Sequence, residues 1–248
     1  MLYLEDLFTT VITLKFYIIV LIGILYILIH HYRYHPVLAY LDILLNYIPV
    51  LTHEFGHILF NKISGGRAKD LVIVTRPYER QMTSQQGYAI TQSTSKLGHG
   101  ITTLGGYILP PIMLLVGAAS AHSEHPIIFL ICYIAIFIYF LILTSRKWSP
   151  IIILILLVTL LYLFLQQAQY TFTHTIMSYS YHFILGVLLG EVIQSSWTIV
   201  KLTFQRPKTQ WDGQALADMT HVPSIAFSLI WISINGYSLY LLFQYSFY

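Results

Sequence analysis

The chain alternates between long apolar segments and short polar connections. A helix needs about 20 apolar residues to cross the hydrocarbon core of a bilayer. Candidate spans occupy residues of about 10–29, 37–63, 99–119, 126–144, 149–166, 181–201 and 223–245. The pattern predicts an all-α polytopic membrane protein of about seven transmembrane helices, formed as a single integral membrane domain over residues 1–248.

Glycine, proline and polar clusters interrupt this apolar pattern. Pro49 lies inside the second candidate span and predicts a kinked or restarted helix. That span should end at Ser64-Gly65-Gly66, because glycine favours helix termination. Gly105-Gly106 and Pro110-Pro111 interrupt the third span, so the count can differ by one; the pairs either loosen the helix or allow close packing. The polar and aromatic stretch 167–180 predicts an interfacial loop.

The longest polar connection covers residues 64–98. It holds two short stretches of strand-like residues, Leu71–Val74 and Gly87–Thr91, with a polar, turn-rich segment between them. This arrangement predicts a small β-hairpin at the membrane surface, inserted after the second span. The hairpin either accepts an extended peptide as an added strand or is an ordinary surface loop.

Composition supports the membrane assignment. The chain is 56% hydrophobic and only 9% charged, whereas soluble domains carry about 25% charged residues. Cys132 is the single cysteine, which excludes an intramolecular disulfide and a cysteine-based zinc site. Glu5 and Asp6 stand where a signal peptide would carry basic residues, so we expect the first span to be retained.

Positive charge predicts the orientation in the membrane. Basic residues concentrate in the connections 64–98, 145–148 and 202–222, which hold Arg67, Lys69, Arg76, Arg80, Lys96, Arg146, Lys147, Arg206 and Lys208. The positive-inside rule places these connections in the cytoplasm. With seven spans, the N-terminus would be cytoplasmic and the C-terminus outside, in what we expect to be a bacterial cell membrane. The cytoplasmic loops account for the formal net charge of +3, so nucleic acid is not an expected partner.

The second span contains the sequence His53-Glu-Phe-Gly-His57. The two histidines are four positions apart, so on a helix both imidazoles project from one face and can bind one metal ion. Glu54 lies about 100° round the helix, where it suits proton transfer better than ligation. Ionisable groups are costly inside a membrane. The pattern therefore favours a zinc site with Glu54 as its general base.

Catalytic zinc usually has a third protein ligand. Asp212 is the favoured candidate, because it lies on the predicted cytoplasmic side with His53 and His57 and because Gly213 leaves room for close approach. Glu191, an acid inside the sixth span, is an alternative ligand, a partner in a polar network or a residue of the substrate path. Three more candidates lie on the cytoplasmic side: His99, Asp218 and His221. The remaining histidines near span ends should be interfacial and solvated: His30, His31, His35, His122 and His125.

These motifs together resemble the site-2 protease family of intramembrane zinc metalloproteases, in its compact branch with a late acidic motif. The resemblance rests on HEFGH at 53–57, GGR at 65–67, GGYILPP at 105–111 and WDGQALADMTHVP at 211–223. It implies that His53 and His57 bind zinc, that Glu54 is the catalytic acid and base, and that Asp212 of an Asp-Gly pair is the third ligand. Trp211 stands where the better-studied branch has leucine, and the preceding segment has no asparagine.

The resulting hypothesis is zinc-dependent hydrolysis of a peptide bond within or beside the membrane. Zinc would activate water and Glu54 would transfer its proton. A substrate helix must unwind first, because its backbone groups bond internally. The expected partners are a membrane protein or peptide substrate and the lipid bilayer. The alternative is a metal-binding membrane protein without protease activity, and a third possibility is a scaffold that carries the motif by chance.

Overall fold

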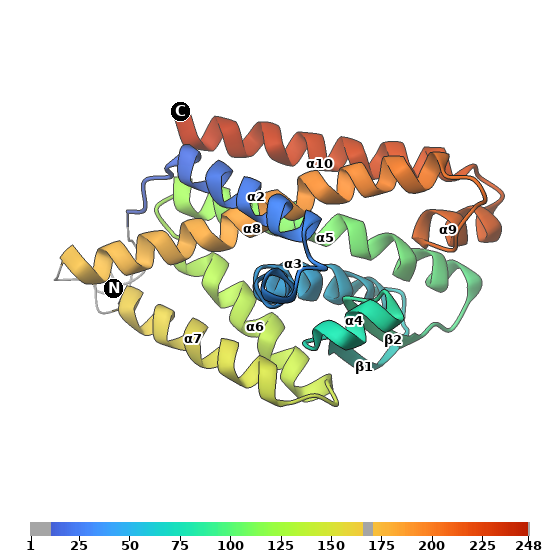
Figure 1. Cartoon of the computed structure of the whole chain (residues 1–248), viewed down its shortest axis with the longest axis horizontal. Helices are drawn as coiled ribbons and strands as arrows, with labels where there is room; N and C mark the ends of the chain where they lie inside the picture. Colours follow the sequence, from blue (N-terminus) through green and yellow to red (C-terminus); the bar gives the residue numbers. More distant parts are fainter. Residues whose placement is uncertain (1–10, 166–170, 248) are drawn as a thin grey trace.

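The computed structural model describes residues 11–165 and 171–247, most of which form helices (Figure 1). The helices, with the labels of Figure 1, are α2 (Phe16–His31), α3 (Pro36–Ile63), α4 (Pro77–Thr83), α5 (Lys96–His122), α6 (Ile127–Leu143), α7 (Trp148–Leu165), α8 (Thr171–Phe204), α9 (Asp212–Thr220) and α10 (Ser224–Phe247). The two strands are β1 (Arg67–Ile73) and β2 (Gly87–Gln92). The predicted α-helical class with a small hairpin is confirmed.

Four of the described helices are long and apolar enough to cross a membrane: α5, α7, α8 and α10. They correspond to the predicted spans 99–119, 149–166, 181–201 and 223–245. The helices α2 and α6 are apolar but shorter, and α3, which holds the HEFGH motif, is not among the four. The predicted total of seven transmembrane helices is therefore not confirmed.

Local sequence sets several helix boundaries. Pro36 occupies the first turn of α3, where its missing N–H has no cost. The same helix ends as predicted at Ser64, and Gly65 follows in a left-handed conformation with φ of 80°. Ser95 caps α5 by accepting a hydrogen bond from the Gly98 N–H at 3.0 Å. Pro49 lies within α3, which continues through it without a restart.

The predicted interfacial loop at 167–180 is wrong where the structure describes it. Residues 166–170 lie outside the described residues, and α8 begins at Thr171. Met177 and Tyr181 are buried in the first turns of this helix, and the Tyr181 hydroxyl donates to the Gly117 carbonyl at 2.6 Å. Packing against α5 thus stabilises a helix that the polar composition of the segment did not indicate.

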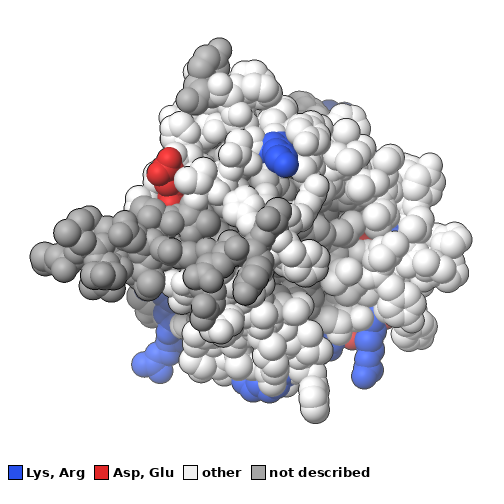
Figure 2. Space-filling model, turned by 90° about the vertical axis from the view of Figure 1, so that its left-hand side faces the viewer, with Lys and Arg blue, Asp and Glu red and all other residues white. Residues whose placement is uncertain are grey.

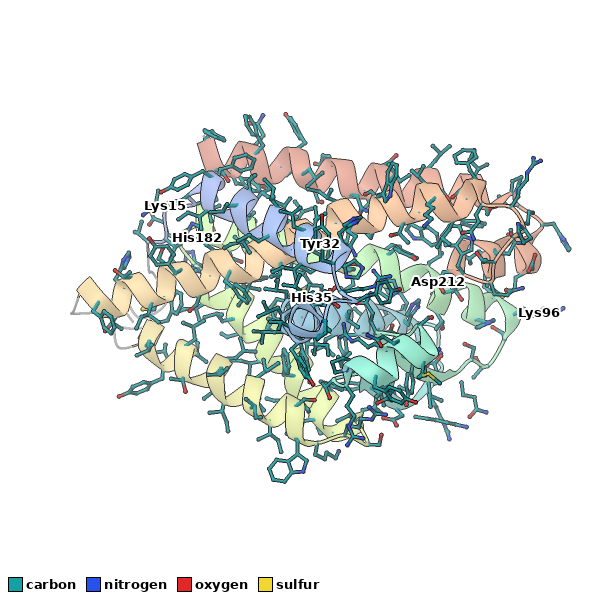
Figure 3. All side chains as sticks on the ribbon, in the orientation of Figure 1. Lys15, Tyr32, His35, Lys96, His182 and Asp212 are labelled. Carbon is teal, nitrogen blue, oxygen red and sulfur yellow. The ribbon has the colours of Figure 1, made fainter. Side chains whose placement is uncertain are left out.

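The helices α2 and α3 form one path through the bundle rather than two antiparallel crossings. α2 runs parallel to α8: the Lys15 N–H donates to His182 at 2.8 Å, and Gly23 approaches Gly186 and Gly190. The helix ends at His31 while α8 continues to Phe204. Figure 3 accordingly shows the α2–α3 joint, labelled at Tyr32 and His35, between the two ends of the bundle.

The start of α2 and the end of α10 lie at the same end of the bundle. The Phe16 ring packs against Phe243 and Phe247, with centroid separations of 5.7 and 5.4 Å. Figure 2 views this end, where most of the described surface carries no charge. The contact places the start of α2 beside the end of α10, while the predicted placement of the two termini relative to a membrane stays a prediction.

The three basic connections 64–98, 145–148 and 202–222 lie at the end of the bundle opposite the start of α2. This agrees with the prediction that they share one side. The Asp70 carboxylate accepts a hydrogen bond from the Ser145 N–H at 3.0 Å, and Arg146 pairs with Glu79 at 2.5 Å. These contacts join the hairpin to the α6–α7 connection. Figure 3 labels Lys96 and Asp212 at this end and Lys15 and His182 at the opposite one.

The predicted hairpin is present, although a helix interrupts it. β1 and β2 pair in antiparallel register, with Leu71 opposite Ala89 and Ile73 opposite Gly87, and α4 lies between them. β1 buries Leu71, Val72 and Ile73. This apolar end of β1 fixes the hairpin against the helices.

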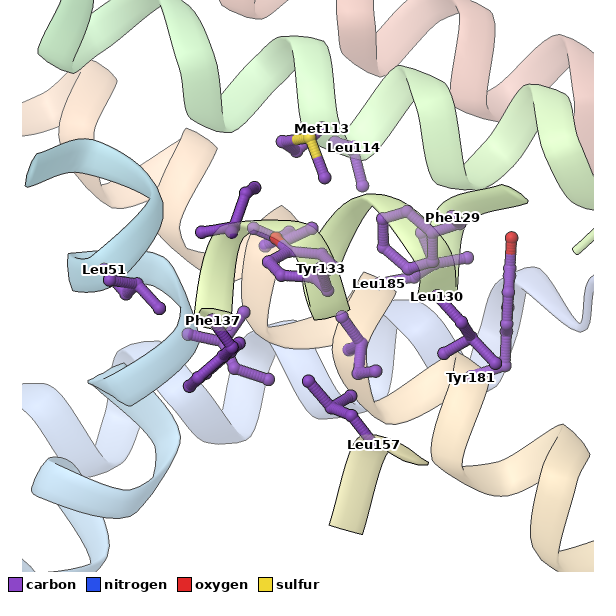
Figure 4. Close-up of a cluster of buried hydrophobic side chains, with 14 of the residues drawn as sticks. Leu51, Met113, Leu114, Phe129, Leu130, Tyr133, Phe137, Leu157, Tyr181 and Leu185 are labelled. Carbon is purple, nitrogen blue, oxygen red and sulfur yellow. The ribbon is translucent and has the colours of Figure 1, made fainter. Parts of the chain in front are cut away.

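An apolar core joins the helices α3, α5, α6, α7 and α8 (Figure 4). Its largest members are aromatic, including Phe129, Tyr133 and Phe137, all fully buried. The Tyr133 hydroxyl finds a polar partner at Thr52 of α3, at 3.1 Å. That bond lies one residue before the HEFGH motif and helps to fix the orientation of α3 against α6.

Candidate metal centre

The two histidines of HEFGH lie on one face of α3 and approach each other closely. The Nε2 atoms of His53 and His57 are 3.3 Å apart. The Asp212 Oδ2 atom lies 3.9 Å from His53 Nε2 and 3.5 Å from His57 Nε2. The point equidistant from the corners of a triangle with these sides is about 2.1 Å from each corner, the length of a zinc bond to imidazole nitrogen or carboxylate oxygen. These three residues therefore fit a zinc ion.

Asp212 reaches the histidines because α9 begins there. Trp211 caps the helix in an extended conformation, and Asp212 occupies the first turn, where a carboxylate is favoured by the helix dipole. Burial raises the pKa of the Asp212 carboxyl, and the neighbouring His57 and His99 oppose that rise. The predicted common side of Asp212 and the histidine pair agrees with this geometry.

Aromatic packing holds the start of α9 in place. The Trp211 ring lies 5.9 Å from Trp231 of α10 and 6.4 Å from Tyr107 of α5. A Cβ added to Gly213 would lie 2.3 Å from the Trp211 ring. The glycine thus leaves room for this indole rather than for the metal ion, which corrects the role predicted for it. The tryptophan that departs from the leucine of the better-studied branch is an anchor for Asp212.

A close crossing of α3 and α5 brings further groups to the histidines. A Cβ on Gly56 would lie 2.3 Å from the Gly105 carbonyl oxygen, so the two backbones are in contact. The next residue, Gly106, faces the imidazoles, since its Cβ would lie 2.4 Å from His57 Nε2. α5 continues through Pro110-Pro111 to His122. Of the two roles predicted for the Gly105-Gly106 pair, close packing is the one that the structure supports.

A hydrogen bond orients one candidate ligand. His57 Nδ1 lies 2.9 Å from the Thr102 carbonyl oxygen. Because a carbonyl only accepts, Nδ1 carries the hydrogen and Nε2 keeps its lone pair for a metal. The His53 ring is held differently, by an edge contact with Tyr107 at 4.8 Å between centroids. Both imidazoles thus have a fixed orientation toward Asp212.

Glu54 lies beside the three candidate ligands and faces a cavity of about 420 Å³. The backbone of Ala89 in β2 hydrogen bonds to its carboxylate. β2 comes this close because Gly87 has no side chain: a Cβ there would lie 2.8 Å from Val50 and 3.2 Å from Glu54. The hairpin therefore forms one wall of the cavity next to the candidate base.

Glu191 is not brought to the histidines. Its carboxylate lies 2.5 Å from the Tyr26 hydroxyl, which is also 2.5 Å from Asn46 Oδ1. The Asn46 amide nitrogen already donates to Asp42, so its oxygen faces the tyrosine. The Tyr26 hydroxyl thus lies between two acceptors, the Asn46 amide oxygen and the Glu191 carboxylate, and donates its hydrogen to them. Of its predicted roles, the structure supports a polar network rather than ligation.

His30 is buried, contrary to the prediction of a solvated interfacial residue. Its Nδ1 lies 2.8 Å from Asp42 Oδ1, and Arg80 of α4 pairs with the other carboxylate oxygen at 3.1 Å. Arg33 hydrogen bonds to the remaining ring nitrogen of His30. The sequence signal for this network was Asp42, an acid within the second predicted span. By contrast, His31, His35 and His122 are exposed as predicted.

The three other candidate ligands that were predicted on the cytoplasmic side lie at a separate groove. His99, Asp218 and His221 line this space of about 740 Å³ together with the polar residues 91–96. Asp218 accepts a hydrogen bond from Gln214 at 2.7 Å. Within the described parts of the chain, only His53, His57 and Asp212 form a group of three that could hold one metal ion.

The fold and site together define a helical membrane protein in which two histidines and one aspartate converge and could hold a metal ion. The family described as Peptidase M50B-like matches residues 16–242, nearly the whole chain, and the chain belongs to this family, which is part of the site-2 protease family. Membership implies metallopeptidase chemistry in an integral membrane protein, usually with zinc. No curated protein and no solved structure matches the chain.

Proposed function

We propose that this protein is an intramembrane zinc metalloprotease that hydrolyses peptide bonds of membrane-embedded or membrane-adjacent substrates. The observation that carries the proposal is the convergence of His53, His57 and Asp212 beside Glu54. A metal-binding protein without hydrolytic activity needs the three ligands but has no use for the adjacent acid. Membership of a metallopeptidase family supports the same conclusion.

Three residues would hold the ion and a fourth would move protons. His53 Nε2, His57 Nε2 and one Asp212 oxygen are the ligands in this proposal. Zinc supplies a Lewis acid for the scissile carbonyl and lowers the pKa of water, as in other hydrolases. Glu54 takes a proton from the attacking water and returns it to the leaving amine. The Ala89 backbone, bonded to the same carboxylate, keeps Glu54 directed into the cavity.

The substrate enters as an extended peptide in this proposal. A helical peptide hides its carbonyl groups in internal hydrogen bonds, so it must unwind before hydrolysis. β2 pairs with β1 along one edge only, and its other edge reaches Glu54 through Ala89. An extended substrate added to that edge would lie beside the candidate base. The positive-inside rule supports a cytoplasmic location for the end of the bundle that carries the hairpin.

The test compares metal content with cleavage in one experiment. Wild type, Glu54→Gln and the control Glu124→Gln, at an exposed turn, are purified and reconstituted in nanodiscs. Zinc is measured by mass spectrometry, and cleavage is measured on a panel of fluorogenic transmembrane peptides. We expect one zinc per chain in all three proteins. Cleavage should fall by about 100-fold or more in Glu54→Gln alone, because general acid–base catalysis contributes that much.

Three results would oppose the proposal. Cleavage by Glu54→Gln at the wild-type rate would remove Glu54 from the mechanism. Wild-type protein that binds zinc but cleaves no peptide of the panel would favour the non-proteolytic metal-binding alternative. If the protein bound no stoichiometric zinc after remetallation, both the protease and the non-proteolytic metal-binding function would be excluded. A scaffold protein that carries the motif by chance would then be the remaining alternative.

A further inference from the structure

One face of α8 is polar within the largely apolar second half of this helix. Glu191, Gln194, Ser195 and Thr198 follow the spacing of a single helical face, and all four line the cavity that contains Glu54. Polar residues inside a membrane helix are costly unless they meet a partner or a wet cavity. The opposite wall of the cavity is also polar, since it includes the turn 84–87 that leads into β2.

Internal contacts explain some of these polar groups. Glu191 bonds to Tyr26. Ser195 donates to the Val192 carbonyl at 3.2 Å and accepts from Asn235 of α10 at 3.4 Å. These two residues therefore connect α8 to neighbouring helices, and their polarity needs no ligand.

Two glutamines of the cavity have no such explanation. The carboxamide oxygens of Gln194 and Gln86 are buried and have no hydrogen-bond partner among the described residues. Burying an unpaired acceptor costs about 1–3 kcal/mol, so a glutamine at such a position is disfavoured unless it has a function. Gln194 comes from α8 and Gln86 from the turn before β2, so two separate elements present the same chemical group to one cavity.

A carboxamide matches a peptide unit, because its NH2 group can donate to the peptide carbonyl and its carbonyl oxygen can accept from the peptide N–H. The last torsion of a glutamine side chain has a broad energy profile, so the carboxamide turns at low cost. An extended peptide in the cavity would offer both donors and acceptors at each residue. A helical peptide would offer none, since its backbone groups are bonded internally.

We propose that Gln194 and Gln86 are substrate-binding residues that hold the unwound backbone of a membrane peptide beside Glu54. The proposal rests on the proposed protease function and adds to its site two residues that would bind the backbone of the substrate. A purely apolar, stably helical peptide would leave both carboxamides unpaired and would bind weakly.

The first test separates binding from structure through Gln194→Met, which keeps the length of the side chain and removes its polar atoms. The matched control is Gln244→Met, near the exposed end of α10. We expect the melting temperature of Gln194→Met to stay the same or rise, because an unpaired acceptor is lost. The KM for a cleaved transmembrane peptide should rise about tenfold with little change in kcat, as expected for contacts made equally in ground and transition states. A structural role would instead lower the melting temperature and leave KM unchanged.

The second test measures binding without cleavage. The Glu54→Gln protein, with and without Gln194→Met, is titrated with two fluorescent peptides of about 25 residues, long enough to span a bilayer. One peptide has a central Asn-Gly-Ser segment and the other has leucines there. The Asn-Gly-Ser peptide should bind more tightly than the leucine peptide, and Gln194→Met should reduce that preference about tenfold.

The outcomes distinguish this inference from the proposed function. Equal binding of the two peptides, or a preference that Gln194→Met leaves intact, overturns the inference even if the wild type cleaves peptides. A preference that depends on Gln194 in a protein that never cleaves would support the peptide site and contradict the protease.

Discussion

Gly106 is the position at which a single methyl group should remove the metal without removing a ligand. An alanine Cβ there would lie 2.4 Å from His57 Nε2 and 2.7 Å from His53 Nε2, which places it in the space that a zinc ion would occupy. Real Cβ contacts are essentially never shorter than 3.0 Å, so the two imidazoles, or the helices that carry them, must shift by about 0.6 Å or more. Metal sites tolerate changes in ligand distance of only about 0.2 Å.

We therefore expect Gly106→Ala to lose stoichiometric zinc and all cleavage activity, with metal affinity reduced by at least about 100-fold. Overpacking at the α3–α5 crossing should also cost about 1–3 kcal/mol of stability. Zinc content after dialysis and a competition titration with a chelator measure the affinity, and thermal unfolding of the metal-free proteins measures the strain.

The matched control is Gly236→Ala in α10, where an added Cβ would meet nothing within 4 Å. This variant should bind zinc and unfold like the wild type. If Gly106→Ala bound zinc with wild-type affinity, the ion would not lie between the two Nε2 atoms, and the proposed centre would be wrong.

Three more predictions concern the surroundings of the centre. Asp212→Ala should lose zinc and activity together, whereas Glu191→Ala should keep stoichiometric zinc; metal analysis showing the reverse would make Glu191 the ligand. Gly213→Ala should displace the Trp211 indole that precedes Asp212 and weaken zinc binding about tenfold or more. An unchanged zinc affinity in a chelator titration would show that the Trp211 ring does not position Asp212. Arg146 lowers the pKa of Glu79, so this largely exposed pair stabilises the fold above the ordinary glutamate pKa and loses its contribution as pH falls through the lowered value. Glu79→Gln should therefore cost less than about 1 kcal/mol at neutral pH and nothing in strong acid, a convergence that thermal unfolding at several pH values can check.

The candidate ligands were accessible from sequence because their pattern is local. The two histidines of HEFGH need only a helix to share a face, and the hairpin needs only short strands near a turn. Asp212 lies far along the chain, but the distribution of basic residues assigned it to the same side as His53. Trp211, by contrast, looked like a departure from a motif, because its aromatic contacts come from α5 and α10.

The path of α2 and α3 was not predictable from hydrophobicity. Both segments are apolar, and each is long enough on its own to suggest a crossing. Their joint lies within the bundle because Gly23 packs on two glycines of α8 and because Asp42 gathers His30 and Arg80 around it. Such contacts join residues that are 12 to 167 positions apart, and single-sequence periodicity carries no information about them.

The division of the centre between α3 and α9 has a consequence for how the protein is made. About 155 residues separate His57 from Asp212. At a synthesis rate of about 5–20 residues per second, the aspartate follows the histidines by roughly 8 to 30 seconds. With Asp212 as the third ligand, a nascent chain holds two potential ligands and the acid Glu54 in the membrane during that interval, yet has no complete centre. Proteolytic capacity would then appear only when the last part of the chain has folded.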